Sequence, residues 1–297
     1  MTATATMQLI DEGALSRSTA VWPLLSGRVP LPAGADPRIG SITVGQLLGH
    51  TSGFVSGPEP FFNDNATIRS VFGPNGASSC EQAARWYVGL PLADDPGTEY
   101  TYLNLNYCLL SLIIEHVTGA PWSDVVRERV QKPRGAVDMY LGHTYERLPL
   151  DAGHATPPPG EPGGGWFMDS LAGAGSWMGT PVDMVRILDG LNPAAPGADL
   201  ISSTLLAAMR ARPATDPGDA SVWYGLGLIN YSSGAYGHTG SLMGSRTMMV
   251  HEADGTTWCI MVNARFSDHG SVLSALMDRA LSRVSAWPSY DLGPDLP

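Results

Sequence analysis

The sequence is poor in charged residues, and positive charges are the scarcer kind. Charged residues make up 15% of the 297, with 17 lysines and arginines against 28 aspartates and glutamates, for a net charge of -11. Lys132 is the one lysine of the chain. Proteins that bind nucleic-acid phosphates or anionic membranes concentrate basic residues on their surface. We therefore expect neither a nucleic acid nor a membrane as a partner.

Cysteines are also few, and long apolar runs are missing. Cys80, Cys108 and Cys259 form no close pair in the sequence, which predicts buried free thiols rather than a disulfide framework or a zinc site. The histidines have no metal-ligand spacing, so we expect no metal and no other cofactor. The longest apolar stretch, near 108–114, is too short to span a bilayer, and the first residues do not resemble a signal peptide. The chain as written is therefore predicted to be cytoplasmic.

The pattern of apolar residues predicts a change of structure near residue 220. Helical periodicity is found before that point, at 3–12, 44–49, 81–89, 106–117, 122–130, 181–191 and 203–210. Strands are predicted after it, at 222–231, 235–242, 244–252 and 256–266, and a last helix at 271–284. An antiparallel sheet covered by helices, with a helical insertion, satisfies this order, which is an α/β (α+β) fold. We expect one lobe from 1–20 and 216–297, and a mostly helical lobe from 21–215.

Four short motifs carry the candidate chemistry. They are Leu47–Gly53 (LLGHTSG), Pro96–Tyr107 (PGTEYTYLNLNY), Gly237–Ser241 (GHTGS) and Trp287–Leu292 (WPSYDL). Each motif alone has little specificity. In this order they resemble the class C β-lactamase, esterase and D-alanyl-D-alanine peptidase superfamily, a group of serine hydrolases. The resemblance runs from Met1 to the tail. It implies a β-lactamase/transpeptidase-like fold and acyl transfer to water from an ester, a β-lactam or a related amide.

Two residues of the second motif gain roles from this resemblance. Tyr102 matches the tyrosine of the family's Tyr-x-Asn motif, which helps to move the proton of the nucleophile, and Asn104 matches the amide that contacts substrate. A phenol with a pKa near 10 needs a nearby cation for such work at neutral pH. From the residues alone, Tyr102 could instead simply pack with its hydroxyl bonded. Asn104 could be the N-cap of the helix that follows.

The third motif occupies the place of the family's Lys-Thr-Gly strand. The resemblance implies a catalytic role for His238 and substrate binding by Thr239, Gly240 and Ser241, with the Ser241 N–H as an oxyanion donor. From the residues alone, His238 could be an ordinary polar residue at a strand end. His50 is assigned to a turn, without a role in proton transfer.

The nucleophile motif of the family, Ser-x-x-Lys, is missing from the sequence. The helix that carries it in relatives continues much like residues 2–13 here, so its lysine is expected just before Met1. Lys132 does not replace it, because Arg129 stands three residues earlier. Three explanations stay open: a misassigned start or truncation, a natural relative without the nucleophile, and a separate chain that complements this one.

The two strands that precede this helix in relatives are missing from the sequence as well. An uncovered strand edge or apolar sheet surface is therefore expected, through which the protein would form a homodimer or aggregate. The expected partner in the site is a small acyl compound. The competing class of function is a non-catalytic or nucleophile-free protein that binds a small molecule in the retained cleft.

Overall fold

The structure, a computed structural model, describes residues 1–57, 59–61, 66–73, 76–143, 168–195, 197–216, 220–242, 244–264 and 266–287. Most of the predicted Trp287–Leu292 motif lies outside these residues. The helices are α1 (Thr2–Asp11), α2 (Val21–Leu25), η1 (Pro37–Ser41), α3 (Val44–Leu48), α4 (Ala66–Phe72), α5 (Cys80–Tyr87), α6 (Asn104–Thr118), α7 (Trp122–Val126), η2 (Arg127–Gln131), η3 (Lys132–Arg134), α8 (Met168–Leu171), η4 (Ala172–Ala174), α9 (Pro181–Asp189), α10 (Ser203–Arg210) and α11 (His269–Leu281). The strands are β1 (Tyr140–Leu141), β2 (Trp177–Met178), β3 (Val222–Tyr224), β4 (Ile229–Tyr231), β5 (Tyr236–Leu242), β6 (Ser245–His251) and β7 (Thr257–Val262).

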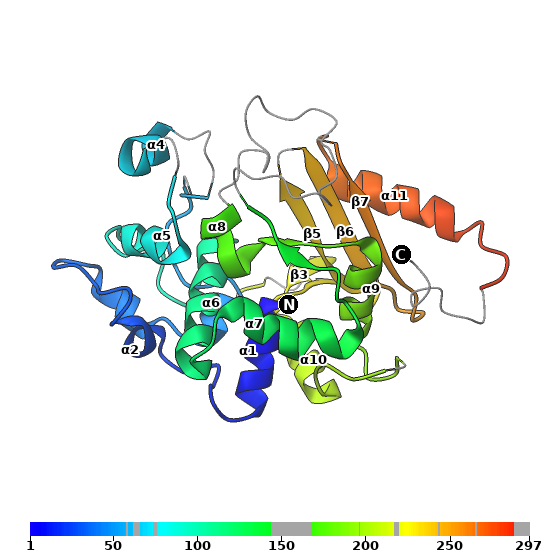
Figure 1. The fold of residues 1–297 in the computed structure, drawn as a ribbon, viewed down its shortest axis with the longest axis horizontal. Helices are drawn as coiled ribbons and strands as arrows, with labels where there is room; N and C mark the ends of the chain where they lie inside the picture. The colour runs from blue at the N-terminus through cyan, green and yellow to red at the C-terminus, as the bar shows by residue number, and fades with distance from the viewer. Residues whose placement is uncertain are drawn as a thin grey trace.

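The main sheet is antiparallel and follows the chain order β3-β4-β5-β6-β7. Figure 1 labels β3, β5, β6 and β7 of this sheet. The single strand predicted at 222–231 is instead the hairpin β3–β4. Two glycines explain the difference. A Cβ on Gly225 would lie 1.9 Å from the carbonyl oxygen of Met209, and Gly227 has a φ of 85° that suits a turn. The strands predicted after residue 235 are confirmed in type and order.

Local chemistry sets the ends of two helices where the sequence predicts them. The helix α6 ends at Gly119, which has a φ of 71° and takes the left-handed C-cap position. The helix α9 begins after Thr180, whose hydroxyl accepts from the N–H of Asp183 in a capping box. These caps fix the lengths of helices that pack in the core.

One large hydrophobic core holds α1 and α6 together, and a small one lies beneath α11. The large core includes Met7 and Leu9 of α1 with Leu109 and Ile113 of α6. The small core centres on β6, β7 and α11, with Leu273 fully buried. In Figure 1 α11 covers the face of the sheet that is turned away from the other helices. The division into two lobes at residues 20 and 215 stays a prediction.

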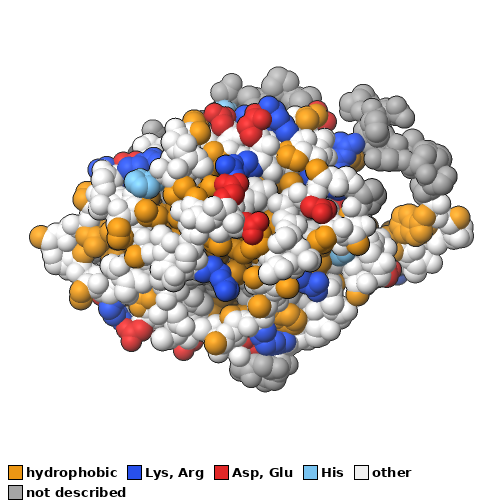
Figure 2. Space-filling view, turned by 90° about the horizontal axis from the view of Figure 1, so that it is seen from below, with side chains coloured by type: hydrophobic (Ala, Val, Ile, Leu, Met, Phe, Trp, Pro, Cys, Tyr) orange, Lys and Arg blue, Asp and Glu red, His pale blue; other side chains and the backbone are white. Residues whose placement is uncertain are grey.

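The outer side of α11 keeps apolar residues in contact with solvent. Val272 and Leu276 are 41% and 49% exposed, and Trp287 beyond the helix is 64% exposed. Figure 2, seen from below, shows hydrophobic side chains on the projecting right-hand end, the end at which α11 lies in Figure 1. Among the helices that the structure describes, none is both long and apolar enough to cross a membrane.

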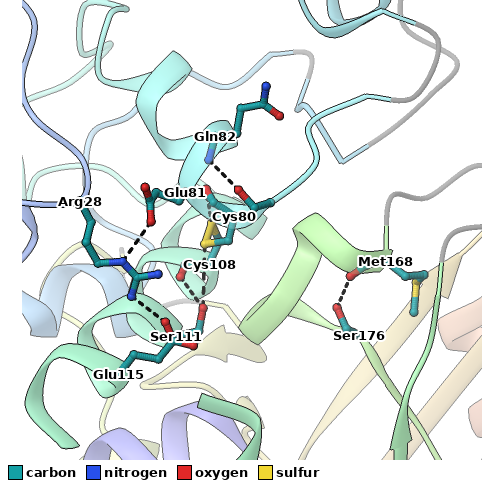
Figure 3. Close-up of a disulfide and its surroundings, with 10 residues drawn as sticks. Arg28, Cys80, Glu81, Gln82, Cys108, Ser111, Glu115, Met168 and Ser176 are labelled. Atoms are coloured by element: carbon teal, nitrogen blue, oxygen red, sulfur yellow. Dashed lines mark hydrogen bonds and ion pairs between the residues drawn. A yellow bond between two sulfur atoms is a disulfide. The ribbon is translucent and has the colours of Figure 1, made fainter. Parts of the chain in front are cut away.

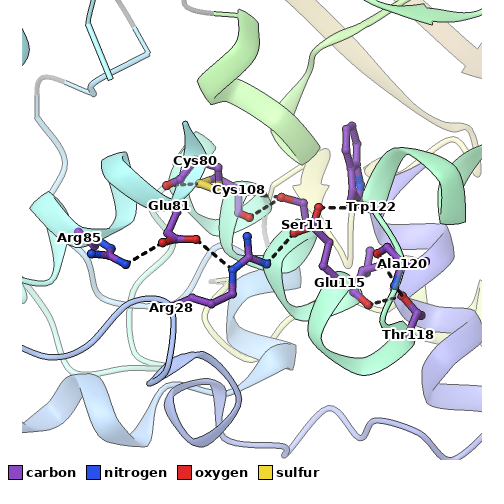
Figure 4. A network of polar contacts seen from close by, with 11 residues as sticks. Arg28, Cys80, Glu81, Arg85, Cys108, Ser111, Glu115, Thr118, Ala120 and Trp122 are labelled. Carbon is purple, nitrogen blue, oxygen red and sulfur yellow. Dashed lines mark hydrogen bonds and ion pairs between the residues drawn. A yellow bond between two sulfur atoms is a disulfide. The ribbon is translucent and has the colours of Figure 1, made fainter. Parts of the chain in front are cut away.

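A disulfide joins Cys80 to Cys108, so the prediction of free thiols at these positions is wrong. The two residues are 28 positions apart in the chain, but α5 packs beside α6 and brings their Cα atoms to 5.5 Å. Figure 3 shows this bond between the two helices. Arg28 joins the same helices a second time, with ion pairs to Glu81 of α5 and Glu115 of α6 (Figure 4). Cys259 is a free cysteine, as predicted, although it is half-buried rather than buried.

Candidate active site

Tyr102 and His238, predicted from separate motifs, lie together. Tyr102 stands just before α6 and His238 lies in β5, and their ring centroids are 6.3 Å apart. Asn104 is the first residue of α6 and is 8% exposed, whereas Tyr102 is 46% exposed. The start of α1 is also near, because a Cβ on Gly227, in the β3–β4 turn, would touch Ala3. The fold therefore brings three distant segments to one place.

The strand β5 presents an open edge beside these residues. Its partner β4 pairs only with Tyr236 and Gly237, so among the described strands none pairs with Thr239 to Leu242 on that side. The carbonyl oxygen of Ala235 accepts a hydrogen bond from the backbone N–H of Tyr231 in β4, so the backbone N–H and C=O of Ala235 point away from β6. In an antiparallel ladder the backbone groups of every second residue point to the same side. By the same alternation, the N–H of Ser241 points away from β6. A Cβ on Gly240 would lie 2.3 Å from the hydroxyl oxygen of Thr247, so a larger residue here would require the Thr247 side chain to turn aside.

Both ring nitrogens of His238 have hydrogen-bond partners. Nδ1 donates to the carbonyl oxygen of Thr239 at 2.7 Å, because a carbonyl can only accept. Nε2 is therefore the acceptor in neutral His238, and the hydroxyl of Tyr224 donates to it at 3.2 Å. Burial lowers the pKa of His238, although its bond to Thr239 acts in the opposite direction. His238 is thus a neutral imidazole rather than the cation that a lysine would supply.

Tyr224 and Tyr107 are site residues that the sequence motifs missed. Tyr224, at the end of β3, packs against His50 and Tyr102 with ring centroids 4.8 and 5.9 Å away. Tyr107 lies in α6 and donates to the carbonyl oxygen of Leu48. Burial raises the pKa of both phenols above the usual value, so both are hydrogen-bond donors at neutral pH. The glycines that follow Tyr224 were the signal that could have singled it out.

His50 is a buried neutral imidazole at the centre of the tyrosines, consistent with its structural assignment. Its Nδ1 accepts from the backbone N–H of Leu103 at 3.3 Å and bonds Asn106 at 3.0 Å. Since Nδ1 accepts, the single proton of the neutral ring is on Nε2, which has no partner in the described part of the chain. Burial, with a smaller effect of His238, lowers the pKa of His50 to about 3. The ring lies 4.3 Å from that of Tyr102, centroid to centroid.

Glu59 is a buried carboxylate that the sequence did not point to. It is 8% exposed, and it accepts from the backbone N–H of Asn104 at 2.7 Å and from Asn104 Nδ2 at 2.6 Å. The N–H of Leu105 bonds it as well, so Glu59 caps the positive end of α6. Burial raises its pKa, against the effect of these bonds. The prediction that Asn104 is itself the N-cap differs from the structure, where Leu103 is the N-cap residue.

Tyr102 is a protonated phenol in this environment. Desolvation, and then the charge of Glu59, raise its pKa to about 12. The α-amino group of Met1 reaches His238 electrostatically, but burial lowers its pKa to about 6, so it is largely neutral at pH 7. The groups that shift the pKa of Tyr102 are Glu59 and Tyr100, beside burial, and no lysine or arginine of the described residues is among them. The described groups therefore do not supply the cation that a tyrosine base requires.

Two hollows of the protein surface lie away from Tyr102. One is lined by Gln8 and Arg129, and the other by Leu15 and Arg17. The cleft at Tyr102 thus stays a prediction. No group of three or more His, Cys, Asp or Glu side chains in the described ranges is arranged to hold a metal ion.

Helices that flank an antiparallel sheet, with a Tyr-x-Asn segment opposite a His-Thr-Gly strand, define a protein of the β-lactamase/transpeptidase-like fold. A β-lactamase family model matches residues 1–281, so the chain belongs to the β-lactamase family, whose members are serine hydrolases. The family resemblance and the fold class that the motifs predict are thereby confirmed.

Proteins similar to this chain include, by their names, penicillin-binding proteins, putative D-alanyl-D-alanine carboxypeptidases and, among solved structures, amidases. Penicillin-binding protein 4 of Amycolatopsis lactamdurans is 30% identical over 285 residues, which cover 88% of this chain and 69% of the relative. A putative D-alanyl-D-alanine carboxypeptidase of Escherichia coli O157:H7 is 27% identical over 131 residues, which cover 44% of this chain and 29% of the relative. The structure of a D-stereospecific amidohydrolase from Streptomyces sp. matches with a TM-score of 0.74 at 26% identity, covering 92% of this chain and 82% of that one.

Proposed function

We propose that this chain forms most of the site of a hydrolase that transfers the acyl group of an amide or ester to water. The observation that carries the proposal is the approach of Tyr102 to the open edge of β5, at 6.3 Å between the rings of Tyr102 and His238. In this proposal Tyr102 moves protons, and the N–H of Ser241 stabilises the oxyanion. Asn104, Thr239 and Gly240 hold the substrate.

A neutral amide or ester fits the site better than a β-lactam. β-Lactams and peptide C-termini carry a carboxylate beside the bond that breaks, and a lysine in the strand motif would attract it. Here the position holds His238, whose two nitrogens are bonded to Thr239 and Tyr224 and whose pKa is lowered by burial. A neutral ring gives a carboxylate no charge to pair with. One similar structure is that of an amidohydrolase, and its name supports an amide.

The nucleophile is the part of the mechanism that the sequence does not contain. Without a Ser-x-x-Lys serine there is no acyl-enzyme, and Tyr102 with a pKa of about 12 is a poor base at neutral pH. The 297 residues alone are therefore proposed to bind an acyl compound without hydrolysing it. The second candidate function, a binding protein that works without a nucleophile, rests on this same observation.

Active-site labelling separates the two candidates. The 297-residue chain should hydrolyse p-nitrophenyl esters and chromogenic β-lactams no faster than its Tyr102→Phe variant, and a fluorophosphonate probe should label none of its serines. A chain lengthened before Met1 by a helical segment with Ser-x-x-Lys should label at that serine and turn over esters. There, Tyr102→Phe should lower turnover by roughly 10²- to 10⁴-fold. Stoichiometric labelling of the unextended chain would overturn the proposal, and an inert extended chain would favour the binding protein.

The free edge of the sheet is the proposed surface for a second copy. Among the described strands, β7 pairs only with β6, and residues 259–262 are half-buried on both faces. Half-exposed apolar side chains beside unpaired backbone groups favour edge-to-edge pairing. We infer a homodimer through β7, which is the predicted edge contact.

The disulfide indicates the redox state of the compartment in which the protein is found. Disulfides persist in oxidising compartments and are rare in the cytosol. The bond between Cys80 and Cys108 therefore argues for an oxidising location, in place of the cytoplasm that the sequence predicts.

A further inference from the structure

We propose that His50 is a positioning residue, whose side chain holds the backbone beside Tyr102 so that the phenol stays close to His238. The inference rests on the proposed function for the role of Tyr102 in proton transfer. It goes further by giving a purpose to the first of the four motifs, Leu47–Gly53, which the proposed function does not use.

Tyr102 lies between two hydrogen bonds to the same residue. The backbone N–H of Thr101 donates to the carbonyl oxygen of His50 at 2.9 Å, and the N–H of Leu103 donates to Nδ1 of its ring at 3.3 Å. The first bond is independent of the side chain at position 50, whereas the second requires an acceptor there. The helix α6 begins directly afterwards, at Asn104. The imidazole of His50 therefore fixes the backbone between the phenol and the start of the helix.

A buried chain of hydrogen bonds keeps Nδ1 of His50 an acceptor. The hydroxyl of Ser52 donates to Oδ1 of Asn106 at 2.7 Å, which turns the amide nitrogen of Asn106 toward Nδ1 of His50 at 3.0 Å. An amide nitrogen only donates, so Nδ1 receives two N–H groups and carries no proton. Burial lowers the pKa of His50 to about 3, and the ring keeps this state at neutral pH.

The backbone of His50 indicates that its side chain is needed. The residue has a φ of 55°, in the left-handed region, where a residue with a Cβ is strained and glycine is not. Glycines stand nearby in the same motif, at Gly49 and Gly53. Strain that persists beside a site points to a functional constraint. The imidazole provides what a glycine lacks, an acceptor for Leu103 and a ring 4.3 Å from that of Tyr102.

A scalar coupling across the hydrogen bond tests the central contact in the unmodified chain. NMR of the ¹⁵N-labelled protein at pH 7 should find a coupling between the backbone nitrogen of Leu103 and Nδ1 of His50. The chemical shift of Nδ1 should be that of an unprotonated ring nitrogen. A protonated Nδ1, or a Leu103 N–H without this coupling, would overturn the proposal whether or not the chain hydrolyses any substrate.

Three variants of the same residue separate the acceptor from the packing of the ring. His50→Asn keeps an oxygen that can accept from Leu103, His50→Leu has nearly the same shape without the acceptor, and His50→Gly removes the acceptor without backbone strain. Nuclear Overhauser contacts between the rings of Tyr102 and His238 should persist in His50→Asn and weaken several-fold in the other two. Equal contacts in all three variants, or equal losses, contradict the proposal. If His50→Leu or His50→Gly does not fold, the coupling in the unmodified chain decides.

Kinetics of the chain lengthened by the Ser-x-x-Lys segment measure the effect on Tyr102. His50→Leu should lower kcat about 10- to 100-fold and leave KM within about 2-fold, because a misplaced proton-transfer group weakens the transition state and not substrate binding. In a Tyr102→Phe background the same substitution should have no further effect on kcat. Equal effects in both backgrounds would show general damage to the fold and refute the proposal. An inert lengthened chain would instead refute the proposed function, and the NMR measurements would still decide the role of His50.

Discussion

The hydroxyl of Tyr224 donates to Nε2 of His238 at 3.2 Å and occupies the only lone pair of that ring. The other nitrogen of His238 donates to its neighbour Thr239. A histidine in this arrangement cannot accept a proton without losing the bond from Tyr224. The position that a lysine holds in relatives is therefore uncharged in this chain, and Tyr224 contributes to keeping it so.

Removal of the Tyr224 hydroxyl should raise the pKa of His238. A hydrogen bond to neutral Nε2 disfavours the protonated form, so Tyr224→Phe removes one cause of the lowered pKa and leaves burial as the other. The ¹H–¹⁵N signals of the His238 ring, followed by NMR through pH 4 to 8, measure the change. Tyr100→Phe is the matched control, because the Tyr100 ring packs against Tyr224 at 5.9 Å between centroids and, among the described residues, its hydroxyl makes no hydrogen bond to Tyr224 or His238. A pKa that is unchanged or lower in Tyr224→Phe contradicts this account of the pair.

The stability of the protein should fall in acid because of His50. The pKa of His50 is about 3 in the folded chain and near 6.5 when unfolded, so the folded state binds fewer protons between these values. The stabilisation is complete above pH 6.5 and is lost as the pH falls toward 3. From pH 7 to 4.5 it should cost about 3 kcal/mol. Urea unfolding at the two pH values measures the loss.

The variant His50→Asn isolates this effect from the other titrating groups. Asparagine tolerates the left-handed backbone at this position, where φ is 55°, and its amide oxygen can accept from the N–H of Leu103. The variant should start from a lower stability and lose about 3 kcal/mol less on acidification than the unmodified chain. Equal losses in the two chains would contradict this prediction, because they would show that the neutral His50 ring does not contribute to the loss of stability in acid.

Local patterns predicted the elements of this fold, and tertiary packing decided what they missed. The ends of α6 and α9 follow from Gly119 and Thr180, residues whose effect extends over one helical turn. The disulfide was missed because only the packing of α5 on α6 brings Cys80 to Cys108. Where a strand breaks into a hairpin, as at Gly225, the cause is a close approach by Met209, far away in the sequence.

The candidate site divides in the same way. Tyr102 and His238 were predicted because they belong to motifs with a fixed order along the chain, and the fold brings them together. Glu59 has no such motif. It lies 45 positions before Asn104, in a segment without helical or strand periodicity, and only the folded chain shows that it caps α6. Glu59 is buried without a basic partner among the described residues, a property that no sequence pattern records.

Loss of the disulfide should destabilise the folded chain, whereas replacement of the free cysteine should not. A bond that closes a loop of 28 residues contributes about 3–4 kcal/mol in the chain-entropy model. Cys108→Ser or a reductant should therefore lower the urea midpoint, whereas Cys259→Ser should leave it nearly unchanged. Thiol titration of the unfolded chain should find Cys259 alone before reduction. Titration of all three cysteines without reductant would exclude the bond.

A charge on the free edge of the sheet should separate a dimer into monomers. Met261 lies on β7, half-exposed, and belongs to neither hydrophobic core, so Met261→Lys adds a charge to the edge without opening a cavity. Light scattering should find a dimer or larger species for the unmodified chain and a monomer for Met261→Lys. Val137→Lys makes the same kind of change at an apolar residue that is 69% exposed and far from β7 in the chain, and it should leave the association unchanged. The edge contact is refuted by a monodisperse monomer of the unmodified chain at high concentration, since unpaired backbone and apolar side chains would then have remained in water with no tendency to pair.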